Sequence, residues 1–274
     1  MGWGDELMVT GRARVMQERD RRKVRVVYER PNRWFEAYDH NPRLAVPSEQ
    51  GNFQILHPRV NGLRPYCTAK TPERWGWRKY QPPVGELYLT ASERAFGAHY
   101  AGRILLEPHI KASASPNKQW GWVRWNKLAW LLTRRGLKVS QIGPAGVPVL
   151  EGIEFIDTPG LRHAAAVIAT ARAAVLPEGG LHHTAAVFGT PAVVIYGGFI
   201  SPEVTGYAGQ TALFAKSDEH PLGCGWRLPC RHCEQAMASI APETVADELE
   251  KLLAERDAAE RDSRNQTMVG AVAA

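Results

Sequence analysis

Residues 103–196 alternate between short apolar runs and segments with helical spacing, and this alternation limits the possible fold more than any other feature. Strands are predicted at 103–106, 138–142, 153–156, 173–176 and 192–196, and helices at 122–132, 163–171 and 182–188. Strands that are apolar at every position are typical of a parallel sheet covered by helices on both faces. The sequence therefore predicts an α/β fold, with ligands bound at the carboxyl ends of the strands.

The first 100 residues are less regular. A helical pattern over 7–18 precedes an apolar strand at 23–28, whereas residues 58–85 are rich in Pro, Gly, Trp and Arg. The Trp and Arg residues of the segment RWGWR, at 74–78, leave two alternatives open. They stack on sugar rings or nucleobases, or they form a partly buried surface cluster, which we favour slightly.

The formal net charge of +6 is unevenly distributed. Residues 1–135 carry 24 Lys and Arg against 12 Asp and Glu, whereas residues 136–274 carry 10 against 16. A basic half attracts anionic partners through its summed field, although a solvated basic surface explains the same counts. No run reaches the roughly 18 apolar residues of a membrane helix, and the N-terminus lacks a secretion signal. We expect a cytoplasmic protein, with a peripheral position at the inner membrane face as a further option.

The segment Pro177–Pro191 (PEGGLHHTAAVFGTP) follows the predicted strand at 173–176. Gly179 and Gly180 let the backbone approach a ligand, and the next helix offers free N–H groups and the positive end of its dipole. These features suit a phosphate or diphosphate, to which His183 can add a donor. A tight turn whose glycines serve only packing explains the same residues, because short glycine motifs are weak evidence.

A second polar loop, Glu107–Trp120, follows the predicted strand at 103–106. Four of its side chains are suited to bind phosphate oxygens: Lys111, Ser113, Ser115 and Lys118. For a single loop of this kind, a solvated polar surface is the default interpretation. Two such loops after neighbouring strands favour a shared anion site at one edge of the sheet.

Three of the four cysteines, Cys224, Cys230 and Cys233, cluster in the sequence, with His220 and His232 nearby. In a cytosolic chain, such a cluster is more typical of thiol or metal chemistry than of disulfides. The residues could ligate zinc, but the usual paired CxxC motifs are absent. We predict no metal, with structural zinc at the three cysteines as the less favoured alternative.

Several segments together resemble the heptosyltransferase-like glycosyltransferases, glycosyltransferase family nine. They are a K-x-W element (118–120), a long stretch around the glycine loop (161–198) and SPEVTGY (201–207). The others are an N-terminal Gly-x-Gly-Asp (2–5), PC-x-x-C (229–233) and the start of the last helix (240–245). The resemblance covers most of residues 1–45 and 103–258, but none of 46–100. It implies the GT-B fold, with two Rossmann-like doubly wound domains, a trimmed N-terminal domain and a C-terminal crossover helix.

The expected division of the chain has four parts. They are an acceptor-side domain (1–100), a nucleotide-sugar domain (101–241), a C-terminal helix (242–260) and a disordered tail (261–274). The last helix is expected to begin at Pro242, because apolar residues then recur at helical spacing.

The resemblance also implies an activity. It is the inverting, metal-independent transfer of a sugar such as heptose from a nucleotide-diphosphate sugar to an anionic acceptor such as lipopolysaccharide core, with no cofactor. Such a transfer needs a carboxylate that takes the acceptor's proton and donors that stabilise the departing diphosphate. By resemblance, Asp5 is the base. The donor-binding positions are Ser113, Lys118, Glu178, Gly179, Gly180 and His183.

Some features depart from the family pattern. Family members usually have a full strand before Gly-x-Gly-Asp, whereas only Met1 precedes Gly2 in this sequence. Glu178 stands where the family usually has Asp. The position of Asp5, just before the predicted helix at 7–18, is also typical of an ordinary acidic residue at a helix N-terminus.

Four alternative functions therefore stay open. They are a nucleotide-sugar epimerase of the same fold, a non-catalytic binding protein on a transferase scaffold, a glycosyltransferase acting on nucleic acid, and a zinc-dependent nucleic-acid-binding module. Nucleic acid is a less favoured partner than an anionic glycan or a lipid-linked acceptor.

Overall fold

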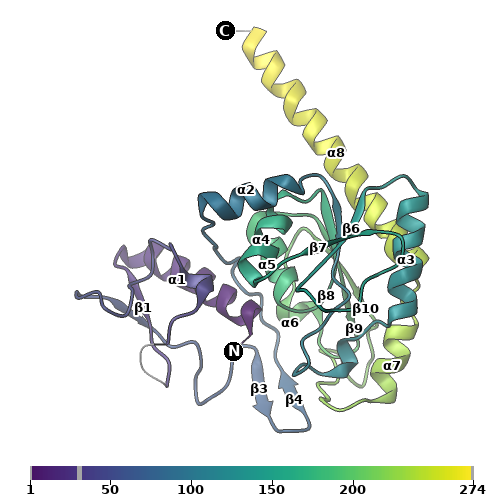
Figure 1. Cartoon of the computed structure of the whole chain (residues 1–274). Helices are drawn as coiled ribbons and strands as arrows, with labels where there is room; N and C mark the ends of the chain where they lie inside the picture. The colour runs from purple at the N-terminus through teal and green to yellow at the C-terminus, as the bar shows by residue number, and fades with distance from the viewer. Residues whose placement is uncertain (1, 30–32, 273–274) are drawn as a thin grey trace.

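The computed structural model describes residues 2–29 and 33–272, with side chains up to residue 262 (Figure 1). At its centre is a six-stranded parallel sheet in the order β10-β9-β8-β5-β6-β7. The strands are β5 (Ile104–Leu106), β6 (Val139–Gly143), β7 (Glu154–Asp157), β8 (Ala173–Pro177), β9 (Ala192–Gly197) and β10 (Gln210–Phe214). The prediction of an α/β fold is confirmed. The five predicted strands correspond to β5–β9, and β10 was missed because its residues at the sheet edge are only partly buried.

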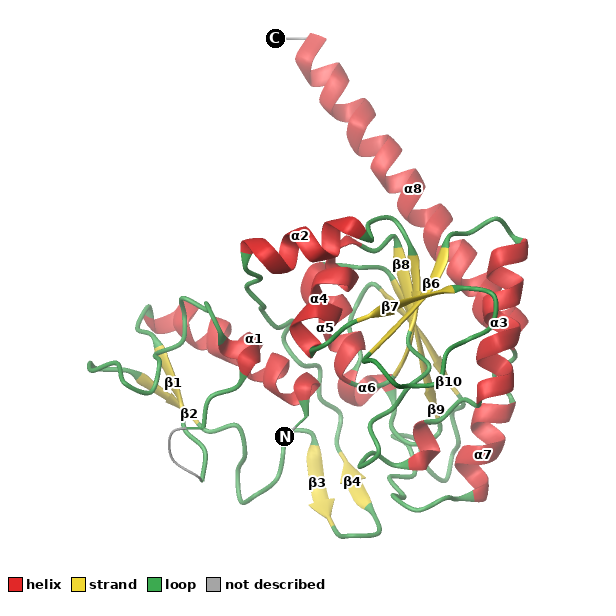
Figure 2. Cartoon of the chain, in the orientation of Figure 1, coloured by secondary structure: helices red, strands yellow, loops and turns green. Residues whose placement is uncertain are grey.

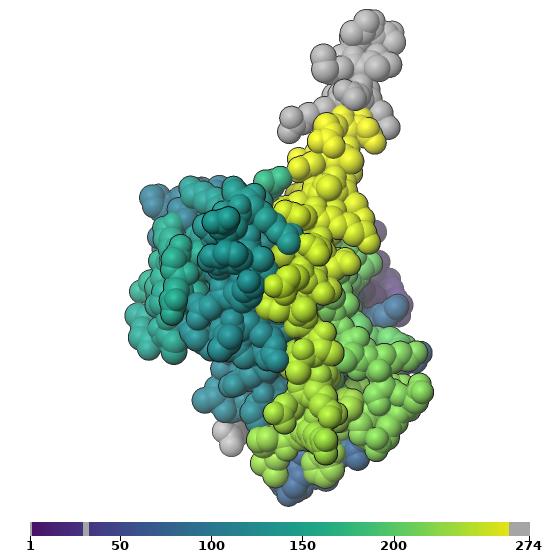
Figure 3. Space-filling model, turned by 90° about the vertical axis from the view of Figure 1, so that its right-hand side faces the viewer, coloured from purple at the N-terminus to yellow at the C-terminus, as the bar shows by residue number. Residues whose placement is uncertain are grey.

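Helices cover both faces of this sheet (Figure 2). One face carries α3 (Trp122–Arg134), α7 (Arg231–Ala238) and α8 (Pro242–Val272), and Figure 3 shows α8 lying along α3. The other face carries α4 (Leu161–Thr170), α5 (Gly180–Phe188) and α2 (Ala91–His99), which packs on α4. The helices predicted at 122–132, 163–171 and 182–188 correspond to α3, α4 and α5.

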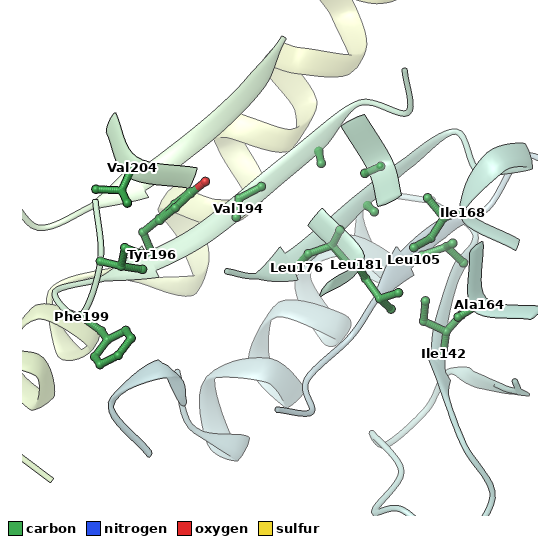
Figure 4. Packing of buried hydrophobic residues seen from close by; sticks show 14 of the residues in the cluster. Leu105, Ile142, Ala164, Ile168, Leu176, Leu181, Val194, Tyr196, Phe199 and Val204 are labelled. Atoms are coloured by element: carbon green, nitrogen blue, oxygen red, sulfur yellow. The ribbon is translucent and has the colours of Figure 1, made fainter. Parts of the chain in front are cut away.

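Successive residues of the central strands enter different cores, because side chains along a strand point alternately to opposite faces. Ile104 and Leu106 of β5 pack in the core beneath α3 and α8. Leu105 packs in the core beneath α4 and α5, together with Leu176 and Val194 (Figure 4). This double burial explains why the strands are apolar at every position.

The front of the chain is built differently. It contains α1 (Trp3–Asp20), a two-stranded parallel sheet of β1 (Val24–Val26) and β2 (Gln54–Leu56), and an antiparallel hairpin of β3 (Cys67–Lys70) and β4 (Trp75–Trp77). Between residues 2 and 90, the described chain has no α-helix besides α1. A doubly wound sheet needs several parallel strands with helical crossovers. The expected Rossmann-like front domain is therefore not formed by the described residues.

Two further expectations differ from the structure. Helix α2, which the predicted boundary at residue 100 assigns to the front, is attached to the sheet side: Arg162 of α4 pairs with Glu93 at 2.6 Å. At Gly97, a Cβ would lie 2.1 Å from the carbonyl oxygen of Ala166, so the two helices touch through backbone. Helix α8 continues past residue 260 to Val272, where a disordered tail was expected.

No helix in the described part of the chain combines the length and the apolar character needed to span a membrane.

Candidate functional site

A cavity of about 300 Å³ opens at the carboxyl ends of β5 and β8. These two strands are direct neighbours, with Leu105 opposite Ala174. From β5 the chain proceeds to β6 and β7 on one side and then returns to β8 on the other. The cavity thus lies where the strand order reverses, which is the usual ligand position in open α/β sheets. The prediction that the two polar loops follow neighbouring strands is confirmed.

All seven residues predicted for the site line this one cavity. They are Asp5, Ser113, Lys118, Glu178, Gly179, Gly180 and His183. Lys111 and Ser115 also line it, whereas His182 does not. The structure therefore brings the sequence-predicted residues together, while their individual roles stay predictions.

The glycine loop leads from β8 into the N-terminus of α5. The Gly179 N–H donates to His182 Nδ1 at 2.9 Å, and the helix begins at Gly180. A Cβ at Gly180 would lie 3.1 Å from a ring atom of Trp3, so this glycine lets α1 approach α5. Gly180 therefore serves helix packing, as expected for a tight turn, and it also lies on the cavity wall. The first N–H groups of α5 have no intrahelical acceptor and provide anion donors there.

Glu178 is buried beneath the loop and forms an ion pair with Lys118. Thr205, in the short helix α6 (Pro202–Thr205), donates to the other carboxylate oxygen at 3.2 Å. Burial alone would raise the pKa of Glu178, but the charge of Lys118, the neighbouring His182 and the hydrogen bonds from Lys118 and Thr205 together outweigh it, so the pKa lies below its ordinary value. The lysine expected to bind diphosphate therefore already neutralises a buried glutamate, and one of its three N–H donors is left for a ligand.

The two adjacent histidines have different tasks. His182 is fully buried, and its Nδ1 accepts from Gly179, so the proton lies on Nε2, which faces the Thr205 carbonyl oxygen at 3.0 Å. His183 lines the cavity, with Nδ1 2.8 Å from the Tyr207 hydroxyl. Burial lowers the pKa of both rings. His183 is therefore neutral at pH 7 and can act as a hydrogen-bonding group.

Asp5 lies in the first turn of α1, and its carboxylate is held by three donors. Tyr66 donates to Oδ1 at 2.5 Å, while Arg64 and the Gly2 N–H contact Oδ2 at 2.9 and 2.8 Å. Through the Gly2 contact, Asp5 caps the N-terminus of α1, as the alternative interpretation expects. A carboxylate has about four acceptor positions, so Asp5 retains one for another hydroxyl while it serves the helix.

Several cavity residues were missed from the sequence. Arg64 and Tyr66 come from the irregular stretch outside the resemblance, and Arg227 comes from the loop before α7. The guanidinium groups of Arg64 and Arg227 lie 4.8 and 5.4 Å from the Trp75 ring. In RWGWR, Trp75 lines the cavity, as the stacking interpretation requires. Trp77 instead packs against Phe199 in the core.

Glu107 is a further acid at the carboxyl end of β5, on the cavity wall. Burial raises the pKa of its carboxyl group to about 8. At neutral pH this group is largely protonated and can donate a hydrogen bond, unlike Glu178. Its position directly after a predicted strand was the signal in the sequence that could have identified it.

The three clustered cysteines lie outside the cavity lining. Cys224, Cys230 and Cys233 gather with His232 so that their possible ligand atoms lie within 4.8 Å of one another. Another buried group of possible ligands is formed by Glu178, His182 and His183. The Glu178 carboxylate and both ring nitrogens of His182 are engaged within the protein, as is Nδ1 of His183.

No protein-family model matches the sequence, and no curated protein matches it. Among solved structures, the glycosyl transferase family 9 protein from Veillonella parvula matches 93% of this chain and 95% of its own length, with a TM-score of 0.62 and 13% identity. This chain has the fold of family 9 glycosyltransferases. The iron-containing dodecameric glycosyltransferase TibC from enterotoxigenic E. coli agrees, with a TM-score of 0.62 and 16% identity over 92% of this chain and 73% of its own.

E. coli ADP-heptose LPS heptosyltransferase II is also similar, at 22% identity over 65% of this chain, with a TM-score of 0.48. The match spans 56% of that protein's length, little more than half. TibC has also been determined in complex with ADP-D-β-D-heptose. The resemblance to family 9 glycosyltransferases, predicted from the motifs, is confirmed for the fold.

Proposed function

We propose that this chain is an inverting glycosyltransferase that moves a sugar from a nucleotide-diphosphate sugar to an anionic acceptor. The observation that carries the proposal is the cavity at the strand-order reversal, which gathers all seven predicted residues from three separate segments. Its family 9 glycosyltransferase fold supports the same activity. ADP-heptose is the first donor to test, because TibC has been determined with it.

The diphosphate of the donor binds at the N-terminus of α5. The free N–H groups near Gly180 and the positive end of the helix dipole favour it. Ser113 and Lys118 approach from the loop after β5 and supply further donors. When the sugar–oxygen bond breaks, these groups stabilise the charge that develops on the departing diphosphate.

Asp5 takes the proton of the acceptor hydroxyl. Its remaining acceptor position receives the hydroxyl, while Arg64 and Tyr66 fix the carboxylate toward the cavity. A positioned base of this kind contributes about 10²–10⁴-fold to the rate. The attack comes from the face opposite the departing diphosphate, so the anomeric configuration is inverted.

The acceptor approaches from the front of the molecule. Arg64, Trp75 and Arg227 form a basic and aromatic wall of the cavity there. The charge excess of residues 1–135 favours an anionic acceptor, such as a phosphorylated glycan or a lipid-linked one. The transfer step in this proposal uses no metal, so added Mg²⁺ should leave the rate unchanged.

A thermal-shift panel of ADP-, UDP-, GDP- and CMP-sugars tests the donor site. A ligand that binds only the folded chain raises its stability by RT ln(1 + [L]/Kd), about 2.7 kcal/mol at a hundredfold excess over Kd. We expect one nucleotide to shift the melting temperature, and Lys118→Ala to remove that shift. If no nucleotide sugar or free nucleoside diphosphate shifts it, the cavity is not a donor site.

Turnover then distinguishes transfer from the alternatives. With the bound donor and an acceptor panel, NMR should show a product of inverted anomeric configuration. Conversion of the donor sugar without an acceptor would identify an epimerase instead. Tight binding with no turnover would support the non-catalytic interpretation.

A further inference from the structure

We propose that Cys224, Cys230, His232 and Cys233 form a tetrahedral site for a structural transition-metal ion of the thiolate-binding class, zinc or iron. The sulfur of Cys224 lies 3.1 Å from that of Cys233 and 3.7 Å from that of Cys230. The Cys233 sulfur lies 3.9 Å from His232 Nδ1. Zn–S bonds of about 2.3 Å place the sulfurs of a tetrahedral site roughly 3.8 Å apart. Three thiolates and one imidazole are a usual donor set for structural zinc.

His232 is the fourth ligand, one of the two histidines that the sequence places near the cysteines without a choice between them. The sequence suggested three cysteines, which leave a tetrahedral site one ligand short. The structure adds the ring of His232, which lies in the first turn of α7 between Cys230 and Cys233. A four-ligand site built by the protein alone is closed, as expected for a structural metal rather than a catalytic one.

The turn that carries Cys224 requires a glycine on each side of it. Gly223 and Gly225 on either side have φ values of 95° and 69°, in the region that favours glycine. A Cβ at Gly223 would lie 2.5 Å from the Phe199 carbonyl oxygen, and one at Gly225 would lie 1.9 Å from that of Trp75. The turn therefore needs both glycines, and it points the Cys224 sulfur toward the start of α7.

Two of the four proposed ligands are fully buried. Cys224 and Cys233 are 1% and 0% exposed, and all four cysteines of the chain are free thiols. Cys230 and His232 are partly buried, so two of the three converging thiols are enclosed, and the three form no disulfide. A bound metal ion explains why they converge, because it binds the deprotonated sulfurs together.

The metal loop is joined to the cavity through Asn117, in the short 3-10 helix Pro116–Lys118. The Asn117 amide donates to the carbonyl oxygens of Trp226 and Leu228, both at 2.7 Å, and accepts from the Cys230 N–H at 3.1 Å. Lys118 is the next residue. A metal ion at the cluster would therefore fix the loop that carries the cavity lysine, although its own ligands lie outside the cavity.

The same loop also holds the front hairpin. Arg74 Nε donates to the Cys224 carbonyl oxygen at 2.9 Å, and the Trp75 N–H donates to that of Gly225 at the same distance. The site thus ties β4, the loop before α7 and the loop after β5 to one point. This inference concerns metal binding and local order, and it does not rest on the proposed glycosyl transfer.

Elemental mass spectrometry on the full chain, purified under reducing conditions without chelator, tests the site. We expect about one zinc or iron ion per chain, and the measurement tells which. Cys233→Ser should lose the ion. Cys67→Ser is the matched control, because Cys67 is equally buried but lies in β3 outside the cluster. Should Cys233→Ser fail to fold, His232→Ala and His232→Cys replace it: the first should lose most of the metal and the second should retain it.

Cobalt substitution and hydrogen exchange complete the test. Cobalt in the wild-type chain should give the strong visible absorption of a tetrahedral thiolate site. Metal removal should speed amide exchange at residues 113–119 and leave α4 unchanged. Less than about a tenth of an ion per chain without cobalt absorption would overturn the site, as would a mass two hydrogens lower that reveals a disulfide. Unchanged exchange at 113–119 would overturn its coupling to the cavity loop.

Discussion

The sheet region and the front region obtain their order in different ways. In β5, neighbouring residues such as Leu105 and Leu106 enter separate cores on the two faces of the sheet. The front has two three-residue parallel strands, and part of its order comes from contacts with the sheet region. Trp3 Nε1 donates to Thr184 at 2.8 Å, and Trp77 Nε1 donates to the Phe199 carbonyl oxygen at 3.0 Å.

The cavity lies between these two regions, and each supplies a different part of it. The sheet region supplies anion-binding groups, namely the start of α5 and Lys118. The front supplies Asp5, Arg64 and Trp75. In the proposed reaction, the sheet region holds the donor, whereas the front activates and orients the acceptor. The variants below test this division, from the largest expected effect to the smallest.

Asp5→Asn should give the largest effect, a loss of about 10²–10⁴-fold in the transfer rate. The amide has nearly the same shape but cannot accept the acceptor's proton. The initial transfer rate at saturating donor and acceptor measures this loss, and donor affinity from the thermal shift should stay close to that of the wild type.

Tyr66→Phe is the matched control for Asp5→Asn. It removes one hydrogen bond to the same carboxylate and leaves the base in place. We expect it to reduce the rate by less than about tenfold, the equivalent of one net hydrogen bond of about 1 kcal/mol. If Asp5→Asn transfers sugar as fast as the wild type, Asp5 serves only the helix end and the proposed mechanism is wrong.

Lys118→Met should give the largest loss of stability, because it leaves the Glu178 carboxylate buried without its partner. Breaking a buried ion pair in this way costs about 3–5 kcal/mol. The double variant Lys118→Met with Glu178→Gln should regain most of this free energy of unfolding, measured by urea denaturation. An additive double variant would show that the pair is not coupled.

The same pair gives a pH dependence with a defined sign. The folded-state pKa of Glu178 lies below its ordinary value of 4.5. The group therefore contributes stability above pH 4.5, and this contribution is lost as the pH falls through the lowered pKa. Below pH 4.5, the free energy of unfolding should decrease more steeply in the wild type than in Glu178→Gln.

The sequence was sufficient for the sheet region because its signals are local. Strands buried on both faces are apolar at each position, and polar loops directly after β5 and β8 identify the ligand edge. The donor-side residues followed from this pattern and from the family resemblance. Their meeting in one cavity also required Asp5, whose placement depends on the packing of α1 against α5.

The front could not be predicted in the same way, because its order depends on contacts that are distant in sequence. Arg64 reaches the cavity by pairing with Asp5, and Trp75 is held by Gly225 from the far end of the chain. His220 and His232 both lie near the cysteines in the sequence, and the choice of His232 depends on where the turn at Gly223 and Gly225 places Cys224. Local spacing carries no signal for such tertiary contacts.

Glu107→Gln should stabilise the chain at alkaline pH. The folded-state pKa is raised from 4.5 to about 8, so the folded chain binds more protons than the unfolded chain between these values. Stability contributed by this group therefore falls as the pH rises through that window. At about 1.4 kcal/mol per pKa unit, the full shift from 4.5 to about 8 would correspond to about 5 kcal/mol. Because the group lies on an open cavity wall, where solvent screens it, we expect the variant to be more stable than the wild type by about 2 kcal/mol above pH 8.

Urea denaturation of wild type and Glu107→Gln at several pH values measures this difference. Asp5→Asn provides the comparison from the front side of the same cavity. A Glu107→Gln curve that stays parallel to the wild type between pH 4.5 and 8 would show that Glu107 is ionised like an exposed acid and does not donate a hydrogen bond to a ligand.

Thr184→Val should have the smallest effect, a loss of about 1 kcal/mol in the free energy of unfolding. Valine keeps the shape of the buried threonine but removes the acceptor of the Trp3 indole N–H, and Thr184→Ser, which retains it, is the control. Because this bond joins α1 to α5, the loss should speed amide exchange in the first turn of α1 while leaving β5 protected. Faster exchange throughout the sheet would show that the front region and the sheet region unfold together as one unit.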